Sequence, residues 1–217
     1  MSGYIYAKRN TACDRDAIQD ALDEAARLGR ATVILEGDFK VNGTLYISDN
    51  THLIIKNGTL SSADKSLLLL TNSNCLLPRT RTLFGTQQGI TISGENGFVS
   101  GKIEFFNVRD FSISNLSFRD LDEAIRLAYV SCGHMHSLSF SDVKKCITAA
   151  IGTRNCTFTD IISEGETESI VFSSERLENR WVNYFGPDVN NNIVRGLKTN
   201  HSPSIIGNFC YDILIEQ

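Results

Sequence analysis

A segment of 22 to 23 residues recurs along the second half of the sequence, and this repeat constrains the fold more than any other feature. "NLSFRDLDEAIRLA" (115–128) is followed 22 residues later by "SLSFSDVKKCITAA" (137–150). A third copy follows 23 residues further on, and a fourth comes after an insertion of 12 residues. The aligned positions of the four copies are Ile113, Leu116, Phe118, Ile125 and Leu127; Met135, Leu138, Phe140, Ile147 and Ala149; Phe158, Ile161, Ser163, Ile170 and Phe172; and Ile193, Gly196, Lys198, Ile205 and Gly207.

This period, with short strand-like pieces and no repeated helix, predicts an all-β fold, the right-handed parallel β-helix. One coil cannot bury its apolar residues alone, but stacked coils share one continuous core. Leucine-rich repeats have a similar length and are the alternative. Their Leu-x-x-Leu-x-Leu-x-x-Asn string is absent from the sequence, which makes them the less favoured interpretation.

The N-terminal part contains the one convincing amphipathic helix, at 14–29. Its apolar residues, among them Ile18, Leu22 and Ala25, fall on one stripe, and Gly29 follows as a stop. We expect this helix to cap the open strand edge of the first coil. The predicted organisation is a single β-helix domain over 1–217, with the capping helix at 14–29, stacked coils at 30–172, an inserted loop at 173–192 and last coils at 193–217.

Composition excludes several classes of function. The net charge is -4 and no long basic run occurs, so we expect no nucleic-acid partner. The longest apolar run is "SLLLL", too short to span a membrane. No secretory signal is visible, which predicts a cytoplasmic protein, or a secreted one if a signal was removed earlier. The 6 cysteines are scattered, so buried free thiols are expected, with no metal site and no cofactor.

Two segments carry a resemblance to a known family. They are "DAIQDALDEAARLGRATVILEGDFKVNGTLYISDNTHLIIKNGTL" (16–60) and "ISGENGFVSGKIEFFNVRDFSISNLSF" (92–118). Both resemble pectin-lyase-like β-helix proteins, above all the polygalacturonases. The resemblance implies a metal-free, inverting glycoside hydrolase that acts on an acidic or plant-type polysaccharide.

The activity motifs of polygalacturonases are degenerate here. The family's Asp-Asp position falls on Thr167 and Glu168, and Lys145 stands where the family's Asn-Thr-Asp ends in Asp. Gly133-His134 comes too early in the chain for the family's histidine, and no Arg-Ile-Lys is present. The sequence therefore departs from a standard polygalacturonase.

Stacking places Glu123, Lys145 and Glu168 in one column, with neighbours about 4.8 Å apart. One interpretation is a surface ladder that avoids stacking like charges, which contributes little to stability. The other is an active site with Glu168 as the acid and Asp122 or Glu123 as the base. Carboxylates two coils apart lie about 9 to 10 Å from each other, close to the spacing of inverting glycosidases. Lys145 would then bind a uronate.

Other candidate site residues surround this column. Arg126 points out of its strand and is either solvated or a contact for an anionic sugar. The inserted loop holds Arg180, Trp181 and Tyr184, and Trp181 either stacks on a sugar or fixes the loop to the body. His201, a structural residue or a catalytic one, is expected near the level of Glu168.

A second function is compatible with the same pattern, namely a non-catalytic β-helix that binds carbohydrate or serves as an assembly subunit. The sequence finishes "NFCYDILIEQ", in which Ile213 and Ile215 have strand alternation. An uncovered coil exposes apolar side chains and unpaired backbone groups. We therefore expect this C-terminal end to contact a second copy of the chain or a separate β-helix subunit.

Overall fold

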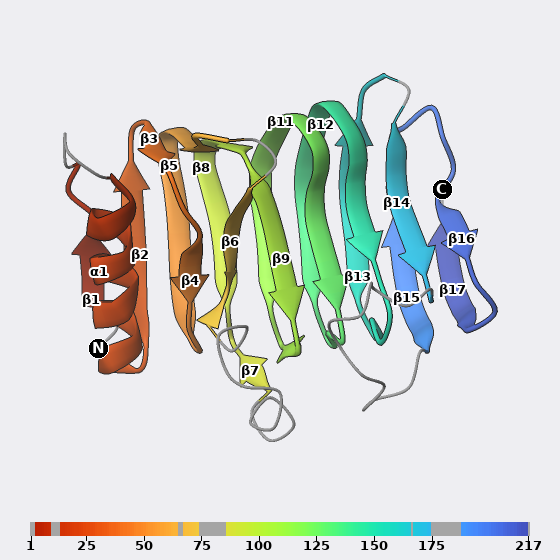
Figure 1. Cartoon of the computed structure of the whole chain (residues 1–217). Coiled ribbons are helices and arrows are strands. Elements are labelled where there is room, and N and C mark those ends of the chain that lie inside the picture. The colour runs from red at the N-terminus through yellow and green to blue at the C-terminus, as the bar shows by residue number, and fades with distance from the viewer. Residues whose placement is uncertain are drawn as a thin grey trace.

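The computed structural model describes residues 3–9, 14–64, 67–73, 86–165, 167–174 and 188–216. These residues form a right-handed parallel β-helix with one helix packed on its N-terminal end (Figure 1). The predicted fold class is confirmed, including the capping helix.

The helix α1 spans Asp14–Leu28. The strands are β1 (Gly3–Tyr6), β2 (Ala31–Glu36), β3 (Phe39–Val41), β4 (Leu45–Ile47), β5 (Thr51–Ser62), β6 (Leu68–Asn72), β7 (Gln87–Gln88), β8 (Thr91–Ser100), β9 (Lys102–Phe106), β10 (Val108–Arg109), β11 (Ser112–Ala128), β12 (His134–Ala149), β13 (Thr157–Ser163), β14 (Glu168–Ser173), β15 (Val189–Arg195), β16 (Ser204–Ile206) and β17 (Cys210–Glu216).

The parallel strands of successive coils stack into walls along the solenoid (Figure 1). We call the path β1-β2-β5-β8-β11-β12-β13-β15-β17 the first sheet. The second sheet is the path β4-β6-β9-β11-β12-β14-β16. The strands β11 and β12 belong to both, because each begins in the first sheet and continues around the coil into the second. Each coil therefore contributes to both walls.

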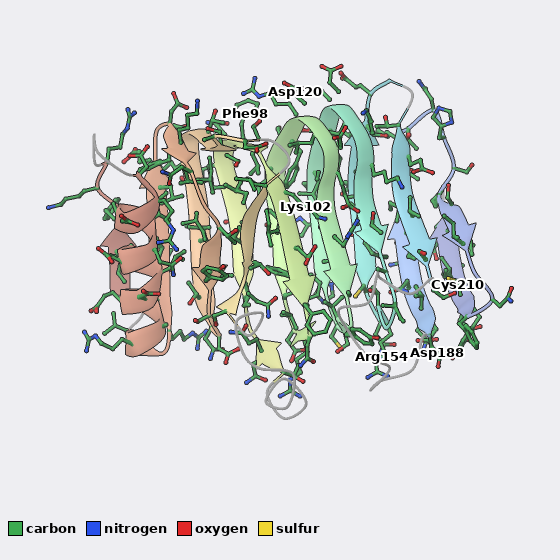
Figure 2. All side chains as sticks on the ribbon, viewed as in Figure 1. Phe98, Lys102, Asp120, Arg154, Asp188 and Cys210 are labelled. Carbon is green, nitrogen blue, oxygen red and sulfur yellow. The ribbon has the colours of Figure 1, made fainter. Side chains whose placement is uncertain are left out.

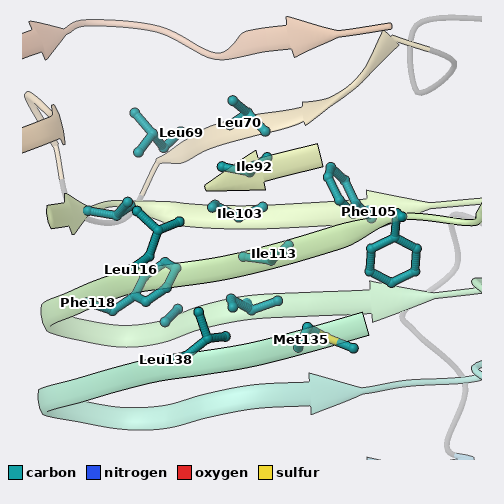
Figure 3. Packing of buried hydrophobic residues seen from close by; sticks show 14 of the residues in the cluster. Leu69, Leu70, Ile92, Ile103, Phe105, Ile113, Leu116, Phe118, Met135 and Leu138 are labelled. Atoms are coloured by element: carbon teal, nitrogen blue, oxygen red, sulfur yellow. The ribbon is translucent and has the colours of Figure 1, made fainter. Parts of the chain in front are cut away.

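Apolar side chains in register fill the interior (Figure 3). In the first sheet one inward column is continuous from β2 to β15, and all of its members are fully buried. Burying each such side chain stabilises the fold by about 1.5 to 3 kcal/mol. The column consists of Val33, Leu53, Ile92, Ile113, Met135, Phe158 and Val194.

The corners between strands depend on residues with positive φ. Asn115, Ser137, Asp160 and Gly196 occupy one corner of successive coils, with φ between 52° and 61°. Asn, Asp and Gly adopt this left-handed conformation at the least cost. The close stacking also excludes side chains, because a Cβ on Gly94 would lie 2.1 Å from the carbonyl oxygen of Asn115.

The predicted alignment of the first three copies is confirmed. Ile125 pairs with Ile147 and Ile147 with Ile170, and all three are fully buried. The predicted alignment of the fourth copy is wrong. Phe158 pairs with Val194 rather than Ile193, and Phe172, not Ile170, pairs with Ile205.

The reason for this error lies in the corner. The repeat predicts an inward apolar column at Gly196, but this residue stands beside Asp160 with φ +61°. A Cβ at this glycine would lie 2.7 Å from the Asp160 carboxylate. Both this short distance and the positive φ favour glycine at the position. A glycine in an apolar column was the available signal that the register had shifted.

The C-terminal coil is the least buried part of the described solenoid. Leu214 and Ile215 of β17 are 49% and 40% exposed, although Ile215 continues the buried column beyond Val194. Ile205, Phe209 and Tyr211 are also exposed.

At the opposite end, α1 covers the solenoid with Ile18, Ala21, Leu22 and Ala25, which are all buried. Gly29 ends the helix with φ +74° and donates its amide to the carbonyl of Ala26.

Among the described cysteines all thiols are free, and Cys146 and Cys156 are buried as predicted. Cys132, predicted to be buried, is exposed in the turn between β11 and β12, and Cys210 on the last strand is partly exposed.

We predict that Ile147→Asp prevents folding, because it places a charge without a partner inside the stack. Such a substitution costs more than about 4 kcal/mol. Thermal unfolding followed by circular dichroism should show no cooperative transition. The matched control is Ile162→Asp, at a side chain that is 40% exposed, which should melt close to wild type. If Ile147→Asp melts at the wild-type temperature, Ile147 is not part of a buried column.

Candidate functional site

A set of charged side chains lies on the outer side of the second sheet, where β9, β11, β12 and β14 are neighbours. We call this set the charged row. The register pairs Glu123 with Lys145 and Lys145 with Glu168, as the sequence predicted. Lys102, at the start of β9, lies on the same wall (Figure 2). The charged row consists of Lys102, Glu104, Glu123, Arg126, Lys145 and Glu168.

Glu123 is the centre of the charged row. Its side chain is 11% exposed, and its Oε2 lies 2.6 Å from Lys102 Nζ and 2.8 Å from Arg126 Nη2. Oε1 accepts hydrogen bonds from Thr148 Oγ1 at 2.6 Å and from Arg126 Nε at 3.1 Å. Both carboxylate oxygens are therefore engaged by cationic or hydroxyl donors.

These donors decide the protonation state of Glu123. Burial raises the pKa of its carboxyl group, but the hydrogen bonds from Lys102 and Thr148 and the positive charges of Lys102 and Arg126 outweigh burial, so the net pKa is lowered. Glu123 is consequently ionised at neutral pH. A carboxylate in this state cannot serve as a proton donor, and it can serve as a base only after a partner leaves.

The other predicted carboxylates are held more loosely. Glu168 Oε2 lies 3.6 Å from Lys145 Nζ, and both side chains are about half exposed. Asp122, offered with Glu123 as the base, pairs instead with Lys144 at 2.6 Å, and both of these side chains are fully in solvent. The hydrogen bond from Lys144 lowers the pKa of Asp122. Asp122 thus belongs to a separate surface pair.

His201 lies where the sequence suggested. Its carbonyl oxygen accepts a hydrogen bond from Ser169 Oγ at 3.2 Å, which puts its backbone next to the residue that follows Glu168. Its side chain is exposed. Arg180, Trp181 and Tyr184 lie outside the described residues, so their predicted contacts stay predictions.

Sequence reasoning missed Lys102, Glu104 and Thr148. Ile103 pairs with Ile125, one coil earlier than the first aligned copy. Extending the repeat backwards by 22 residues from Ile125 would have placed Lys102 beside the Glu123 column. Thr148 gave no such signal. Its hydroxyl donates to Glu123, which is in a different column on the neighbouring strand, and the repeat aligns only residues of the same column.

Within the described residues, no group of three or more His, Cys, Asp or Glu side chains is arranged to hold a metal ion. The helix α1 is neither long enough nor apolar enough to cross a membrane, and this holds for every helix in the part of the chain that the structure describes. The charged row therefore offers charge and hydrogen bonds, supplied by lysine, arginine, threonine and glutamate side chains.

Comparison with known proteins extends the description of the fold. No protein-family model matches the chain, and no curated protein matches it. Among solved structures, the surface adhesin PfbA of Streptococcus pneumoniae is similar with a TM-score of 0.69 and 16% identity. Iota-carrageenase complexed to iota-carrageenan fragments is similar with a TM-score of 0.65 and 15% identity. A tailspike protein of E. coli bacteriophage HK620 in complex with a pentasaccharide is similar with a TM-score of 0.64 and 14% identity.

These similarities cover most of this chain but only part of the others. The alignments span 89% of the chain and 57% of the adhesin, 90% and 48% for the carrageenase, and 89% and 37% for the tailspike. The chain thus spans between about a third and just over half of each neighbour. At such identities the comparison establishes the shared right-handed β-helix fold.

We predict that Glu123→Gln destabilises the protein by about 3 kcal/mol near neutral pH, because it removes the carboxylate that Lys102 and Arg126 share and leaves Lys102 only its longer pair with Glu104, at 3.4 Å. The pKa of Glu123 is lowered from 4.5, so its contribution is fully present above that value and is lost as the pH falls through the folded-state pKa. Urea unfolding at neutral pH and at acidic pH checks this.

The difference between wild type and Glu123→Gln should therefore shrink in acid. Asp122→Asn is the control, because its ion pair is fully solvated, and it should unfold like wild type at either pH. An equal loss of stability for Glu123→Gln at both pH values would contradict the conclusion that Glu123 stabilises the fold as an ionised carboxylate.

Proposed function

We propose that this protein is a carbohydrate-binding β-helix that contacts an acidic polysaccharide through the charged row. The observation that carries the proposal is the in-register line Glu123, Lys145 and Glu168, whose buried member is anchored and whose other two members reach solvent. The tailspike in complex with a pentasaccharide and the carrageenase complexed to carrageenan fragments support a carbohydrate as the partner.

Lys145 is the main contact in this proposal. Its ammonium group faces Glu168 at 3.6 Å, and both are half exposed. An exposed pair of this kind is weak, so its exchange for a uronate or sulfate group costs little. Glu168 can then accept hydrogen bonds from sugar hydroxyls, while the remaining N–H groups of Arg126 offer further donors. Rigid strands position all three groups.

Glycoside hydrolysis of the polygalacturonase type is the second candidate. Glu123 and Glu168 are separated by two strand spacings, about 9.6 Å, near the upper end of the range of about 6.5 to 9.5 Å for inverting enzymes. Glu168 would be the acid and Glu123 the base, with His201 nearby. This function ranks second because both oxygens of Glu123 already have donors.

The test is isothermal titration calorimetry with a hexamer of galacturonic acid. Wild type should bind, and Lys145→Ala should weaken binding about tenfold, since a charge-assisted hydrogen bond contributes roughly 1.5 kcal/mol or more. The control is Lys144→Ala, which removes the same charge from the neighbouring residue and should leave binding unchanged. Equal affinities of the two variants, or no binding by wild type, would overturn the proposal.

The same hexamer separates binding from hydrolysis. If wild type releases new reducing ends and Glu168→Gln releases them at least about a hundredfold more slowly, the second candidate replaces the first. Inverted anomeric configuration of the initial product, seen by NMR, would then be required. Intact hexamer after incubation leaves carbohydrate binding as the function.

We also propose that the C-terminal coil packs against a second copy of this chain. The support is its exposed apolar set, in which Leu214 and Phe209 are about half exposed, and the outer edge of β17, which no described strand covers. Edge strands of this kind readily pair with another chain.

Leu214→Lys should therefore shift the protein from dimer to monomer in light scattering. The control is Tyr4→Lys, at the other end of the first sheet, which should stay dimeric. A wild-type protein that is monomeric at micromolar concentration contradicts this proposal.

A further inference from the structure

The outer side of the first sheet carries two lines of hydroxyl and imidazole side chains that the charged row does not involve. The strands place His52, Thr91, Ser112, His134 and Thr157 in one line. The second line, two residues further along each strand, contains Ser93, Ser114, His136 and Thr159. Neighbours in a line are about 4.8 Å apart. We call these two lines the hydroxyl strip, and between β5 and β13 it contains no Lys, Arg, Asp or Glu.

Most of the strip's hydrogen-bonding capacity is unused by the protein. His52 Nε2 and Ser93 Oγ lie 2.7 Å apart and bond to each other. In the part of the chain that the structure describes, side chains such as Ser112, His136 and Thr159 make no hydrogen bond to another protein group. Hydroxyl and neutral imidazole groups both donate and accept. The strip therefore presents paired donors and acceptors at regular intervals.

A hollow of about 760 Å³ lies at the N-terminal end of the strip. This is within the usual range of about 300 to 1,000 Å³ for small-molecule sites. Its walls come from the end of α1 and the starts of β2, β5 and β8, and include Arg30, Thr32, Asn50, His52 and Thr91. The last two residues also belong to the hydroxyl strip, so the hollow and the strip are continuous.

Two exposed aromatic rings complete the surface beyond the hollow. Tyr4 pairs with Thr32 and Tyr6 with Ile34, so both tyrosines follow the two lines of the strip onto β1. They are 68% and 59% exposed. A tyrosine offers an apolar ring face together with a polar hydroxyl. Exposed aromatic rings beside a polar hollow are suited to a ligand with both apolar and hydroxylated faces.

We propose that the hydroxyl strip and its hollow bind an uncharged oligosaccharide that lies across the strands, parallel to the axis of the solenoid. Sugar hydroxyls donate and accept hydrogen bonds, as the side chains of the strip do. Among the described residues that line the hollow, Arg30 is the one cation, so the lining is not built to hold a highly charged anion. Burial lowers the pKa of His52, against a smaller opposing effect of Glu95, which keeps its imidazole neutral. This site is on a different sheet from the charged row and does not rest on the function proposed above.

The probes are four uncharged hexasaccharides, namely cellohexaose, maltohexaose, laminarihexaose and xylohexaose. Calorimetry should detect binding of at least one. Thr91→Arg fills the junction of hollow and strip and should weaken that binding at least about tenfold. The matched control is Thr59→Arg on the later part of β5, where the side chain faces Phe98 of the adjacent strand rather than the strip. It should bind like wild type.

A second variant guards against misfolding of the first. Tyr4→Ala combined with Tyr6→Ala removes the exposed rings without touching the core, and it should also weaken binding. Lys145→Ala should bind the uncharged sugar like wild type, which separates this site from the charged row. The inference is overturned if none of the four sugars binds, or if both strip variants, with wild-type melting curves, bind as tightly as wild type.

Discussion

The in-register stacking of inward side chains is the constraint on which the rest of the structure depends. Parallel strands bring identical coil positions within about 4.8 Å, so each inward side chain must pack on its counterparts above and below. Phe118 and Phe140 show this directly, with ring centroids 5.1 Å apart and an interplanar angle of 13°. Because each coil contacts mainly its neighbours, stability is close to a sum over coil interfaces. A substitution in one column therefore weakens chiefly the interfaces of its own coil.

The same register arranges the outer faces. An outward residue meets its counterparts on both adjacent coils, so like charges in one column would repel each other. The order Glu123, Lys145 and Glu168 avoids this. Lys102 and Arg126 then bring two cations to one buried carboxylate, which is a stronger arrangement than the exposed Asp122–Lys144 pair. Position around the coil thus decides whether a pair is a structural anchor or a solvated contact.

Sequence reasoning could predict the coil and the Glu123–Lys145–Glu168 alignment, because both follow from a period of 22 to 23 residues, and it could predict the capping helix from its apolar stripe. It could not distinguish the roles of Asp122 and Glu123. The corner at Asp120, with φ 59°, sets which of these two adjacent side chains lies against the sheet and which extends into solvent, and the repeat period does not reveal that corner. The fourth copy failed for a related reason. The offset from Phe158 to Val194 differs from that between Val171 and Ser204, so no single period describes this coil.

The long strands β11 and β12 carry both candidate surfaces on one backbone. Ser112 and Ser114 at the start of β11 belong to the hydroxyl strip, and Glu123 and Arg126 near its end belong to the charged row. The inward residues between them hold both ends in register. Both surfaces are lines parallel to the solenoid axis, and each added coil extends them by about 4.8 Å. A scaffold that grows in this way is matched to linear polymers, because its binding surface lengthens in proportion to the ligand.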